Sequence, residues 1–428
     1  MLQTNRRYMT RRRFILTVGA IASTSLLAAC GDDSEDESAG QQDETTPAEA
    51  TTTPAAEATD PSPTATQPSP TATATPEPEG PTLGPDGHFE TVQVSDDGTR
   101  HLIPLRKIQS GGPPKDGIPS IDSPQFVGSD DWDEQRFDDD QFVLGVEVNG
   151  ERRAYPFQIM VWHELVNDEI AGVPILASYC PLCGSAIAFV REIETDSGRE
   201  AVEFGVSGKL YNSDLLMYDR KTDSYWSQLT GTAVVGELTG QRLDFYPSEL
   251  MTWGDWKNTY PDSVVLTRST GFNRDYDNPP YAGYDESPGI WFPVTATDDR
   301  LHEKTRVTGV ELSLTNFAAY PDDLVAEHGP VNDEVRGVPL LVFANPAAGD
   351  NVVVFLREVD GQTLQFSMDD EGLVDEETGS RWTYDGLAVS GELEGAQLEQ
   401  VDTIKGFWFA WYAFHQQTAL WLPDEASR

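Results

Sequence analysis

The chain has 428 residues, of which 72 are acidic and 29 basic, so its formal net charge is −43 at neutral pH. A surface this acidic repels phosphate groups, and we therefore expect neither nucleic acid nor an anionic lipid surface as a partner. The three cysteines of the sequence are too few for a disulfide framework, so the globular part must fold on an apolar core.

Residues 1–29 have the features of an export signal. Arginines precede an apolar stretch, Phe14 to Ala29, which is short for a membrane-spanning helix. The sequence Leu27-Ala28-Ala29-Cys30 resembles a lipoprotein cleavage box, and Arg11-Arg12-Arg13 resembles a twin-arginine signal, which exports folded proteins. We expect Cys30 to be lipidated and to anchor the chain in membrane lipid at the outer, extracytoplasmic face of the cell membrane. The alternatives are an uncleaved signal anchor and an ordinary general-secretion lipoprotein signal.

A linker follows the proposed lipidated cysteine. Residues 30–87 are rich in Thr, Pro, Ala, Asp and Glu and contain no Lys or Arg. A segment of this composition buries too little apolar surface to fold, so it is predicted to be a disordered tether.

After the linker, two parts of the chain match one another, and we assign the first to residues 88–303 and the second to residues 304–428. The matching segments are Gly145-Val-Glu-Val with Gly309-Val-Glu-Leu, Ala154-Tyr-Pro with Ala319-Tyr-Pro, His163 with His328, Val166-Asn-Asp-Glu with Val331-Asn-Asp-Glu, and Gly172-Val-Pro with Gly337-Val-Pro. The sequence therefore predicts a duplicated fold unit.

Short runs of β-branched and aromatic residues, separated by Gly, Asn and Asp, predict strands. In the first repeat these runs are residues 142–148, 173–179, 185–191, 202–206, 215–218 and 233–236. Helical patterns are few, at residues 156–163 and 248–257. The expected fold is an α+β, β-rich architecture of two tandem pseudo-repeats with few helices.

Several blocks together resemble the bacterial family called domain of unknown function 3179. The blocks are Gly111-Gly-Pro-Pro-Lys-Asp-Gly-Ile-Pro119, Trp162-His-Glu-Leu-Val-Asn-Asp168, Tyr179-Cys-Pro-Leu-Cys-Gly-Ser-Ala186 and Gly208-Lys-Leu-Tyr-Asn-Ser-Asp-Leu-Leu-Met-Tyr-Asp-Arg220. The resemblance covers roughly residues 105–425 and implies no activity and no assigned catalytic residues.

The repeats differ at the one place where the first carries thiols. The first repeat has Cys180-Pro-Leu-Cys183, and the second has Asn345-Pro-Ala-Ala348. A spacing of two residues brings the sulfur atoms close enough to form a disulfide or to hold one soft metal ion. We therefore place the candidate functional site in the first repeat.

Four interpretations of the Cys180/Cys183 pair remain open. A structural zinc site needs four protein ligands, which here would require a dimer. Dithiol redox chemistry is possible, although the strand-like sequence after Cys183 differs from a thioredoxin-type helix. A soft ion such as copper would be bound by both thiolates with His163 as third ligand or base and Met217 as a weaker candidate. Finally, the pair could form an inert local disulfide.

Polar residues near the thiols are candidates for supporting roles. Asp168 is expected either to form a turn or to orient a metal ligand by hydrogen bonding to it. The other candidates form a polar cluster: Lys209, Asn212, Asp214, Tyr218 and Asp219. No comparable polar cluster is apparent in the second repeat. The sequence lacks a serine nucleophile elbow, a phosphate-binding loop and a dinucleotide fingerprint, which argues against those enzyme classes. The sequence thus predicts a soft-metal or dithiol site, with a non-enzymatic binding or scaffold module holding a structural cysteine pair as the alternative.

Overall fold

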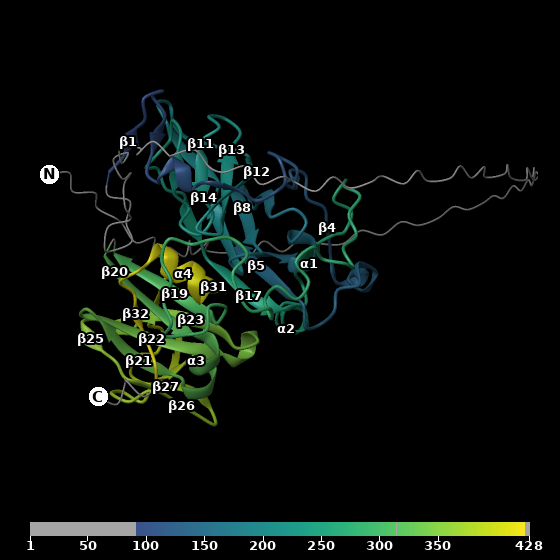
Figure 1. Ribbon diagram of the computed structural model, residues 1–428. Helices are drawn as coiled ribbons and strands as arrows, with labels where there is room; N and C mark the ends of the chain where they lie inside the picture. The colour runs from purple at the N-terminus through teal and green to yellow at the C-terminus, as the bar shows by residue number, and fades with distance from the viewer. Residues whose placement is uncertain (1–90, 314, 424–428) are drawn as a thin grey trace, which may run out of the picture. The chain divides into compact units, whose positions relative to one another are not determined.

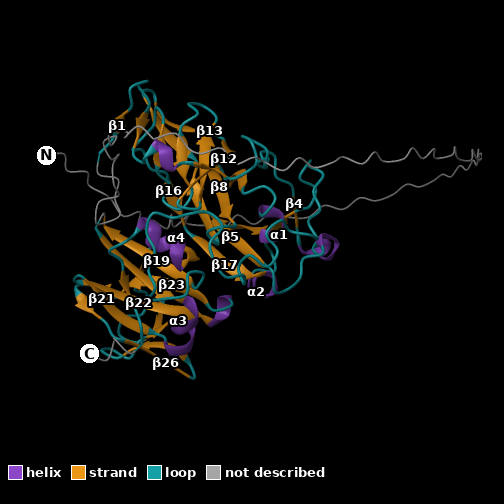
Figure 2. Cartoon of the chain, viewed as in Figure 1, coloured by secondary structure: helices purple, strands orange, loops and turns teal. Residues whose placement is uncertain are grey.

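Strands dominate the structure, a computed structural model that describes residues 91–313 and 315–423 (Figure 1). The described residues contain four short α-helices: α1 (Phe157–Met160), α2 (Trp253–Thr259), α3 (Asp322–His328) and α4 (Trp408–Phe414) (Figure 2). The predicted α+β, strand-rich architecture is therefore confirmed. None of the helices in these two ranges is long and apolar enough to cross a membrane. Cys30, the proposed signal and the proposed tether lie outside the described residues, so their assignments stay predictions.

The first sheet has the same strand order and the same strand directions in both repeats. In the first repeat the order is β17 (Ser248–Thr252), β5 (Phe142–Val148), β6 (Glu151–Pro156), β18 (Val264–Leu266) and an added edge strand, β4 (Phe126–Val127). In the second repeat the order is β31 (Thr403–Phe407), β19 (Arg306–Ser313), β20 (Asn316–Pro321) and β32 (Ala419–Leu420). In each sheet the last shared strand is parallel to its neighbour and the other pairs are antiparallel.

The second sheet is also duplicated, and in the first repeat it carries the cysteines. Its antiparallel strands are β16 (Asp244–Tyr246), β9 (Ser185–Val190), β8 (Val173–Cys180) and β7 (Leu165–Ile170). The counterparts are β30 (Glu399–Gln400), β23 (Asn351–Leu356), β22 (Val338–Asn345) and β21 (Val331–Val335). In the colours of Figure 1, the first set is blue to teal and the second is green to yellow.

The third sheet is a meander that differs in length between the repeats. The first repeat has β12 (Phe204–Tyr211), β13 (Asp214–Asp219), β14 (Tyr225–Ser227) and β15 (Ala233–Val235), with β1 (Gln93–Val94), β2 (Arg100–His101) and β3 (Gln109–Ser110) added. The second repeat has β26 (Phe366–Asp369), β27 (Gly372–Asp375), β28 (Arg381–Trp382) and β29 (Ala388–Ser390). Strands β12 and β13 have 8 and 6 residues, whereas β26 and β27 have 4 each. The first hairpin of the meander therefore extends further in the first repeat.

The remaining strands form two small hairpins. These are β10 (Glu192–Thr195) with β11 (Gly198–Ala201), and β24 (Glu358–Val359) with β25 (Gln362–Thr363). The short 3₁₀ helices are η1 (Leu105–Lys107), η2 (Ser129–Asp131), η3 (Asp133–Gln135) and η4 (Pro346–Ala348).

Equivalent side-chain hydrogen bonds occur within each of the two repeats. The Tyr155 hydroxyl donates to Asp168 at 2.7 Å, and the Tyr320 hydroxyl donates to Asp333 at 2.8 Å. The other pairs of equivalent bonds join an asparagine side chain to a strand backbone and a tryptophan indole to an aspartate: Asn167 with Phe204 and Asn332 with Phe366, Trp226 with Asp219 and Trp382 with Asp375. These networks confirm that the chain contains two copies of one fold unit.

A tryptophan packs directly over a glycine in each first sheet. A Cβ atom added at Gly145 would lie 1.9 Å from the Trp256 ring, and one added at Gly309 would lie 2.3 Å from the Trp411 ring. Glycine is required at both positions because any side chain would overlap the indole. Each tryptophan lies on a helix that follows the edge strand, so this contact fixes helices α2 and α4 on their sheets.

The helices at the two predicted helical patches are shorter than the sequence indicated. Residues 248–257 were expected to be helical, but they divide into strand β17 and the first part of α2. The division comes at Thr252, whose hydroxyl accepts the Asp255 N–H and caps the helix. In the 156–163 patch, only Phe157–Met160 is α-helical. Among the predicted strands, residues 142–148 match β5 at both ends.

Candidate metal centre

Both thiols lie at the turn between β8 and β9. Strand β8 ends at Cys180, which pairs with Ser185 at the start of β9, and the Cys183 N–H donates to the Cys180 carbonyl at 3.2 Å. The side chains of Cys180 and Cys183 are buried, and both are free thiols. The structure therefore describes the reduced cysteine pair and not the disulfide.

A second turn meets the cysteines from the opposite sheet. Asn212 and Ser213 connect β12 and β13, and both have positive φ, 54° and 65°, as a two-residue hairpin turn requires. The carbonyl oxygen of Ser213 accepts a hydrogen bond from each thiol, at 3.5 Å from Cys183 Sγ and 3.9 Å from Cys180 Sγ. The next residue, Asp214, places Oδ1 3.9 Å from Cys183 Sγ.

These two turns bring three possible metal ligands together. The sulfur atoms of Cys180 and Cys183 and a carboxylate oxygen of Asp214 all lie within 4.8 Å of one another, and all three residues are buried. We call these three residues the thiol site. Both of its turns are altered in the second repeat, since the cysteines are replaced and the β26–β27 hairpin is shorter.

The Asp214 carboxyl is strongly affected by its environment. Its Oδ2 accepts the Ser227 hydroxyl at 2.7 Å and the Leu229 N–H at 3.3 Å. Burial raises the pKa of Asp214 to about 7, although these hydrogen bonds favour the charged form and limit the rise. The carboxyl can therefore gain or lose a proton near neutral pH.

A second carboxyl, Glu164, belongs to the same electrostatic environment. It lies between α1 and β7 with φ of 60° and is buried. Burial, and then the charge of Asp214, raises the pKa of Glu164 to about 8. Burial also raises the pKa of the Cys183 thiol, with further contributions from Cys180 and Asp214. Within the described ranges, no Lys, Arg or His side chain forms a hydrogen bond or ion pair with these groups.

One polar atom at this turn has no partner. The Ser213 hydroxyl is buried and forms no hydrogen bond. An unsatisfied buried hydroxyl costs about 1–3 kcal/mol, so it calls for a further partner. It lies in the residue whose carbonyl faces both sulfur atoms, which places the unsatisfied group in the turn that builds the thiol site.

Residues of the second repeat pack against both turns of the thiol site. The Phe407 N–H donates to the Cys183 carbonyl at 2.8 Å, and the Asn212 amide donates to the Ala413 carbonyl of α4 at 3.3 Å. Gly184, with φ of 60°, faces the Phe407 ring, which an added Cβ would approach to 2.8 Å. One apolar core accordingly contains Cys180 and Cys183 together with Phe407 and its neighbours.

His163, the predicted third ligand, is placed in another hydrogen-bond network. Its Nδ1 lies 2.7 Å from the Pro119 carbonyl oxygen and its Nε2 lies 2.8 Å from the Tyr276 hydroxyl. Since a carbonyl only accepts, Nδ1 carries the proton and Nε2 accepts from Tyr276. Burial lowers the pKa of His163 to about 4, so the ring is neutral at physiological pH. The structure does not bring it into the group of converging ligand atoms, and His328 of the second repeat is exposed.

The other predicted residues divide between several places. Met217 is buried on β13, but strand alternation directs it to the opposite face from Asp214. Asp168 accepts from Tyr155 and from Arg153 at 2.6 Å, and the Tyr155 bond recurs in the second repeat. These contacts give Asp168 a structural position.

The predicted polar cluster is not one site. Asn212 and Asp214 lie at the thiol end of the β12–β13 hairpin, whereas Tyr218 and Asp219 lie at its other end. Tyr218 donates to Asp116 at 2.6 Å, and Lys209 is half-buried on β12. Our interpretation that the second repeat has nothing comparable was wrong for Asp219. Its hydrogen bonds to threonine and tryptophan recur at Asp375, which the unequal hairpin lengths conceal in a sequence comparison.

Glu164 and Ser213 are the features of the site that sequence reasoning missed. Glu164 directly follows the histidine that attracted attention, and Ser213 directly precedes Asp214. The available signal was their presence in two distinctive blocks of the first repeat. Only the fold shows that these two blocks meet at the thiols.

The chain belongs to the family described as "Protein of unknown function (DUF3179)", whose model matches residues 115–418. No curated protein and no solved structure matches it. The family resemblance seen in the sequence is thus confirmed. Because the family description assigns no activity, the function has to be argued from the site.

Proposed function

We propose that this member of the family binds one soft or borderline metal ion at the thiol site, through Cys180, Cys183 and Asp214. The observation that carries the proposal is the convergence of three buried ligand atoms within 4.8 Å of one another. This convergence depends on two turns that are both altered in the second repeat. A difference confined to one copy of a duplicated fold supports a role other than folding.

The donor set fits a metal ion that prefers thiolate ligands. Two thiolates favour Cu(I) over hard cations, and a carboxylate oxygen also suits Zn(II). Metal–sulfur bonds of about 2.3 Å and metal–oxygen bonds of about 2.0–2.2 Å would require only a modest contraction of the present spacing. Three protein ligands would leave a coordination position for another molecule.

Charge supports the same conclusion. Three acidic groups, Cys183, Asp214 and Glu164, are buried together without a cationic side chain bonded to them in the described part of the chain. A bound cation would compensate the charge that Cys180, Cys183 and Asp214 carry as ligands. The unsatisfied Ser213 hydroxyl provides a further polar atom beside them.

Dithiol exchange is the second candidate, because Asp214 contacts Cys183 and its pKa of about 7 suits a proton acceptor. Cys180 and Cys183 would form a disulfide by giving two electrons and two protons to the disulfide of a partner protein. The burial of both thiols favours metal binding, since exchange requires a partner sulfur to reach one of them.

The proposed location is the outer face of the cell membrane, with the lipid on Cys30 as anchor. The cleavage-box sequence before Cys30 supports this location. Folding in the reducing cytoplasm before twin-arginine export would allow the thiols to acquire metal while reduced.

Anaerobic metal titration tests the proposed function. The mature protein should bind about one equivalent of Zn(II) or Cu(I) in competition with a chromophoric chelator. Cys180→Ser combined with Cys183→Ser should abolish this binding, and Asp214→Asn should weaken it at least about tenfold. The matched control is Asp369→Asn, in the second-repeat hairpin. Equal metal binding by the wild type and the double cysteine variant would refute the proposal.

A redox titration separates the two candidates. Dithiol exchange predicts reversible formation of a Cys180–Cys183 disulfide under mild oxidation, with a rate that depends on Asp214. Metal binding predicts that the loaded protein is protected from thiol-alkylating reagents. A protein that forms the disulfide readily but takes up no metal would favour dithiol exchange.

A further inference from the structure

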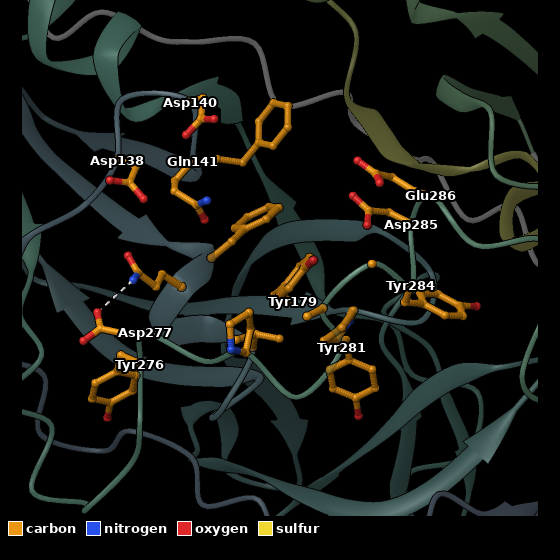
Figure 3. A pocket seen from close by; sticks show the side chains of 18 of the residues that line it. Asp138, Asp140, Gln141, Tyr179, Tyr276, Asp277, Tyr281, Tyr284, Asp285 and Glu286 are labelled. Atoms are coloured by element: carbon orange, nitrogen blue, oxygen red, sulfur yellow. Dashed lines mark hydrogen bonds between the residues drawn. The ribbon is translucent and has the colours of Figure 1, made fainter.

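A cavity of about 510 Å³ lies beside the thiol-bearing turn (Figure 3). Tyr179 and Pro181, on either side of Cys180, form part of its wall, and Tyr284 connects it to the turn by donating to the Leu182 carbonyl at 3.2 Å. Neither cysteine lines the cavity. It is therefore a neighbouring chamber with its own chemistry.

Aromatic rings form much of the cavity wall. They are Phe142, Phe157, Tyr179, Tyr276, Tyr281, Tyr284 and Phe407. Packing holds several of them in place: Phe157 stacks on Tyr179 with ring centroids 4.0 Å apart, and Tyr284 packs edge-on against Trp291 at 4.7 Å. Rings that are already fixed can contact a cation without a large ordering cost.

One cationic side chain of the protein already packs against this aromatic wall. The Arg306 guanidinium lies 5.0 Å from the Phe142 ring centroid and 5.3 Å from the Phe407 ring centroid. Both distances are typical of cation–π contacts. The aromatic lining is therefore compatible with positive charge.

Carboxylates surround the same space. Asp277 is neutralised by Arg268, at 2.6 Å, and by Arg136, at 3.7 Å. The four others, Asp138, Asp140, Asp285 and Glu286, form no ion pair within residues 91–313 and 315–423. In Figure 3, Asp138 and Asp140 lie on one side of the cavity and Asp285 and Glu286 on the other. Among the described residues, Arg306 is the only cationic one that lines the cavity, so the net charge of this lining is negative.

A buried acceptor also lacks a partner in this wall. The Oε1 atom of Gln158 is buried and forms no hydrogen bond, although its Nε2 contacts Asp277 at 3.5 Å. An N–H or O–H group of a ligand would satisfy it. The cavity thus offers aromatic faces, carboxylates and a hydrogen-bond acceptor.

We propose that this cavity binds a small organic cation carrying an ammonium group. Organic ammonium ions are desolvated more easily than hydrated metal ions and gain from ring faces as well as from carboxylates. Anions are repelled by the carboxylate rim. This inference goes beyond metal binding at the thiol site and does not depend on it.

Calorimetric titration of the mature protein tests the proposal with defined probes. Choline and butane-1,4-diamine represent quaternary and primary ammonium ions, and 3,3-dimethylbutan-1-ol is the neutral isostere of choline. At least one cation should bind saturably below about 20 mM, and the alcohol should bind about tenfold more weakly than choline if choline binds. Succinate should not bind.

Two variants and one matched control locate the site. Tyr281→Leu removes a ring, and Asp285→Asn with Glu286→Gln removes two rim charges. Each should weaken cation binding at least about fivefold. Glu392→Gln with Glu394→Gln alters two exposed carboxylates of the second repeat that do not line the cavity and should leave binding unchanged.

Several results would overturn this proposal. Saturable binding of neither cation, equal binding of choline and its neutral isostere, or tight binding of succinate would each do so. Cation binding that is equally sensitive to the rim pair and to the control pair would show only the general acidity of the surface. Because Tyr281→Leu could disturb folding, thermal unfolding of each variant is measured alongside, and the charge variant then decides the result.

Discussion

At the scale of single residues, adjacent positions in one segment have separate chemical environments. His163 is neutral and lies between a carbonyl and a tyrosine hydroxyl. Its neighbour Glu164 has a raised pKa, because it is buried and because the charge of Asp214 acts on it. The histidine was the more obvious candidate from sequence because imidazole is a common metal ligand. Its Nε2 atom could bind a metal ion only by giving up the hydrogen bond from Tyr276.

The lowered pKa of His163 predicts a pH-dependent contribution to stability. The unfolded ring has a pKa of 6.5 and the folded ring a pKa of about 4, so the unfolded state binds more protons between these values. The contribution of His163 is complete above pH 6.5 and is lost as the pH falls through about 4, by up to about 3 kcal/mol. Protonated Nε2 could no longer accept from Tyr276, which is the physical cause of the loss.

Chemical denaturation of wild type and His163→Gln at a series of pH values measures this effect. The stability difference between the two proteins should shrink as the pH falls from 6.5 to 4. Comparing the proteins at each pH removes the contributions of Asp214 and Glu164, which have the opposite sign. His328→Gln, at the exposed histidine of the second repeat, should show a constant difference. A constant difference for His163→Gln as well would contradict the assigned hydrogen bonds.

At the scale of elements, the site depends on two turns from different sheets. The β8–β9 turn supplies the thiols and the longer β12–β13 hairpin supplies Asp214 and the Ser213 carbonyl. The second repeat retains the sheets but has η4 at the first turn and a shorter hairpin at the second. The common scaffold therefore forms without the cysteines of the first turn and with a shorter hairpin at the second.

Exchange of one turn tests this separation of scaffold and site. Replacing Cys180, Leu182 and Cys183 by the second-repeat residues Asn, Ala and Ala should abolish metal binding, because both sulfur ligands are lost. Destabilisation should stay within about 2–5 kcal/mol, the range for removing one large buried side chain, with the fold retained. Circular dichroism and metal titration of the same preparation measure both outcomes. Metal binding at wild-type affinity would show that the ion is held elsewhere.

Sequence patterns predicted the elements better than their association. Alternating and β-branched runs located β5, β8 and β9 because strand signals are local. The loss of cysteines from one repeat indicated where a site would be. The partner of the thiols could not be read in this way, since Asp214 reaches them only through the packing of two sheets, and a hairpin length difference obscured the correspondence of Asp219 with Asp375.

At the scale of the whole molecule, the second repeat supports the first. Backbone and side-chain hydrogen bonds connect Phe407 and Ala413 to the two turns of the thiol site. A partly buried ion pair joins Arg242 to Glu311 at 2.6 Å, and His415 contacts the same glutamate at 2.9 Å. The duplicated unit without thiols is thus a structural part of the site.

Anchoring is the prediction that concerns the chain outside the described residues. Cys30→Ser should release the protein from the membrane fraction, because the lipid would have no attachment point. The globular part should keep the wild-type thermal unfolding transition, since Cys30 precedes residue 91, where the described fold begins. Cell fractionation of Cys30→Ser beside a Cys183→Ser control measures this effect. Retention of Cys30→Ser in the membrane at the wild-type level would exclude anchoring through Cys30.

X-ray absorption at the edge of the bound metal is the most direct test of the proposed coordination. Zn-loaded protein should show two sulfur ligands near 2.3 Å and at least one oxygen ligand near 2.0–2.2 Å. The Cys180→Ser, Cys183→Ser variant should retain no zinc after the same loading, and the light-atom shell should change in Asp214→Asn. A spectrum dominated by imidazole scattering, with no sulfur ligand, would contradict metal binding by Cys180, Cys183 and Asp214.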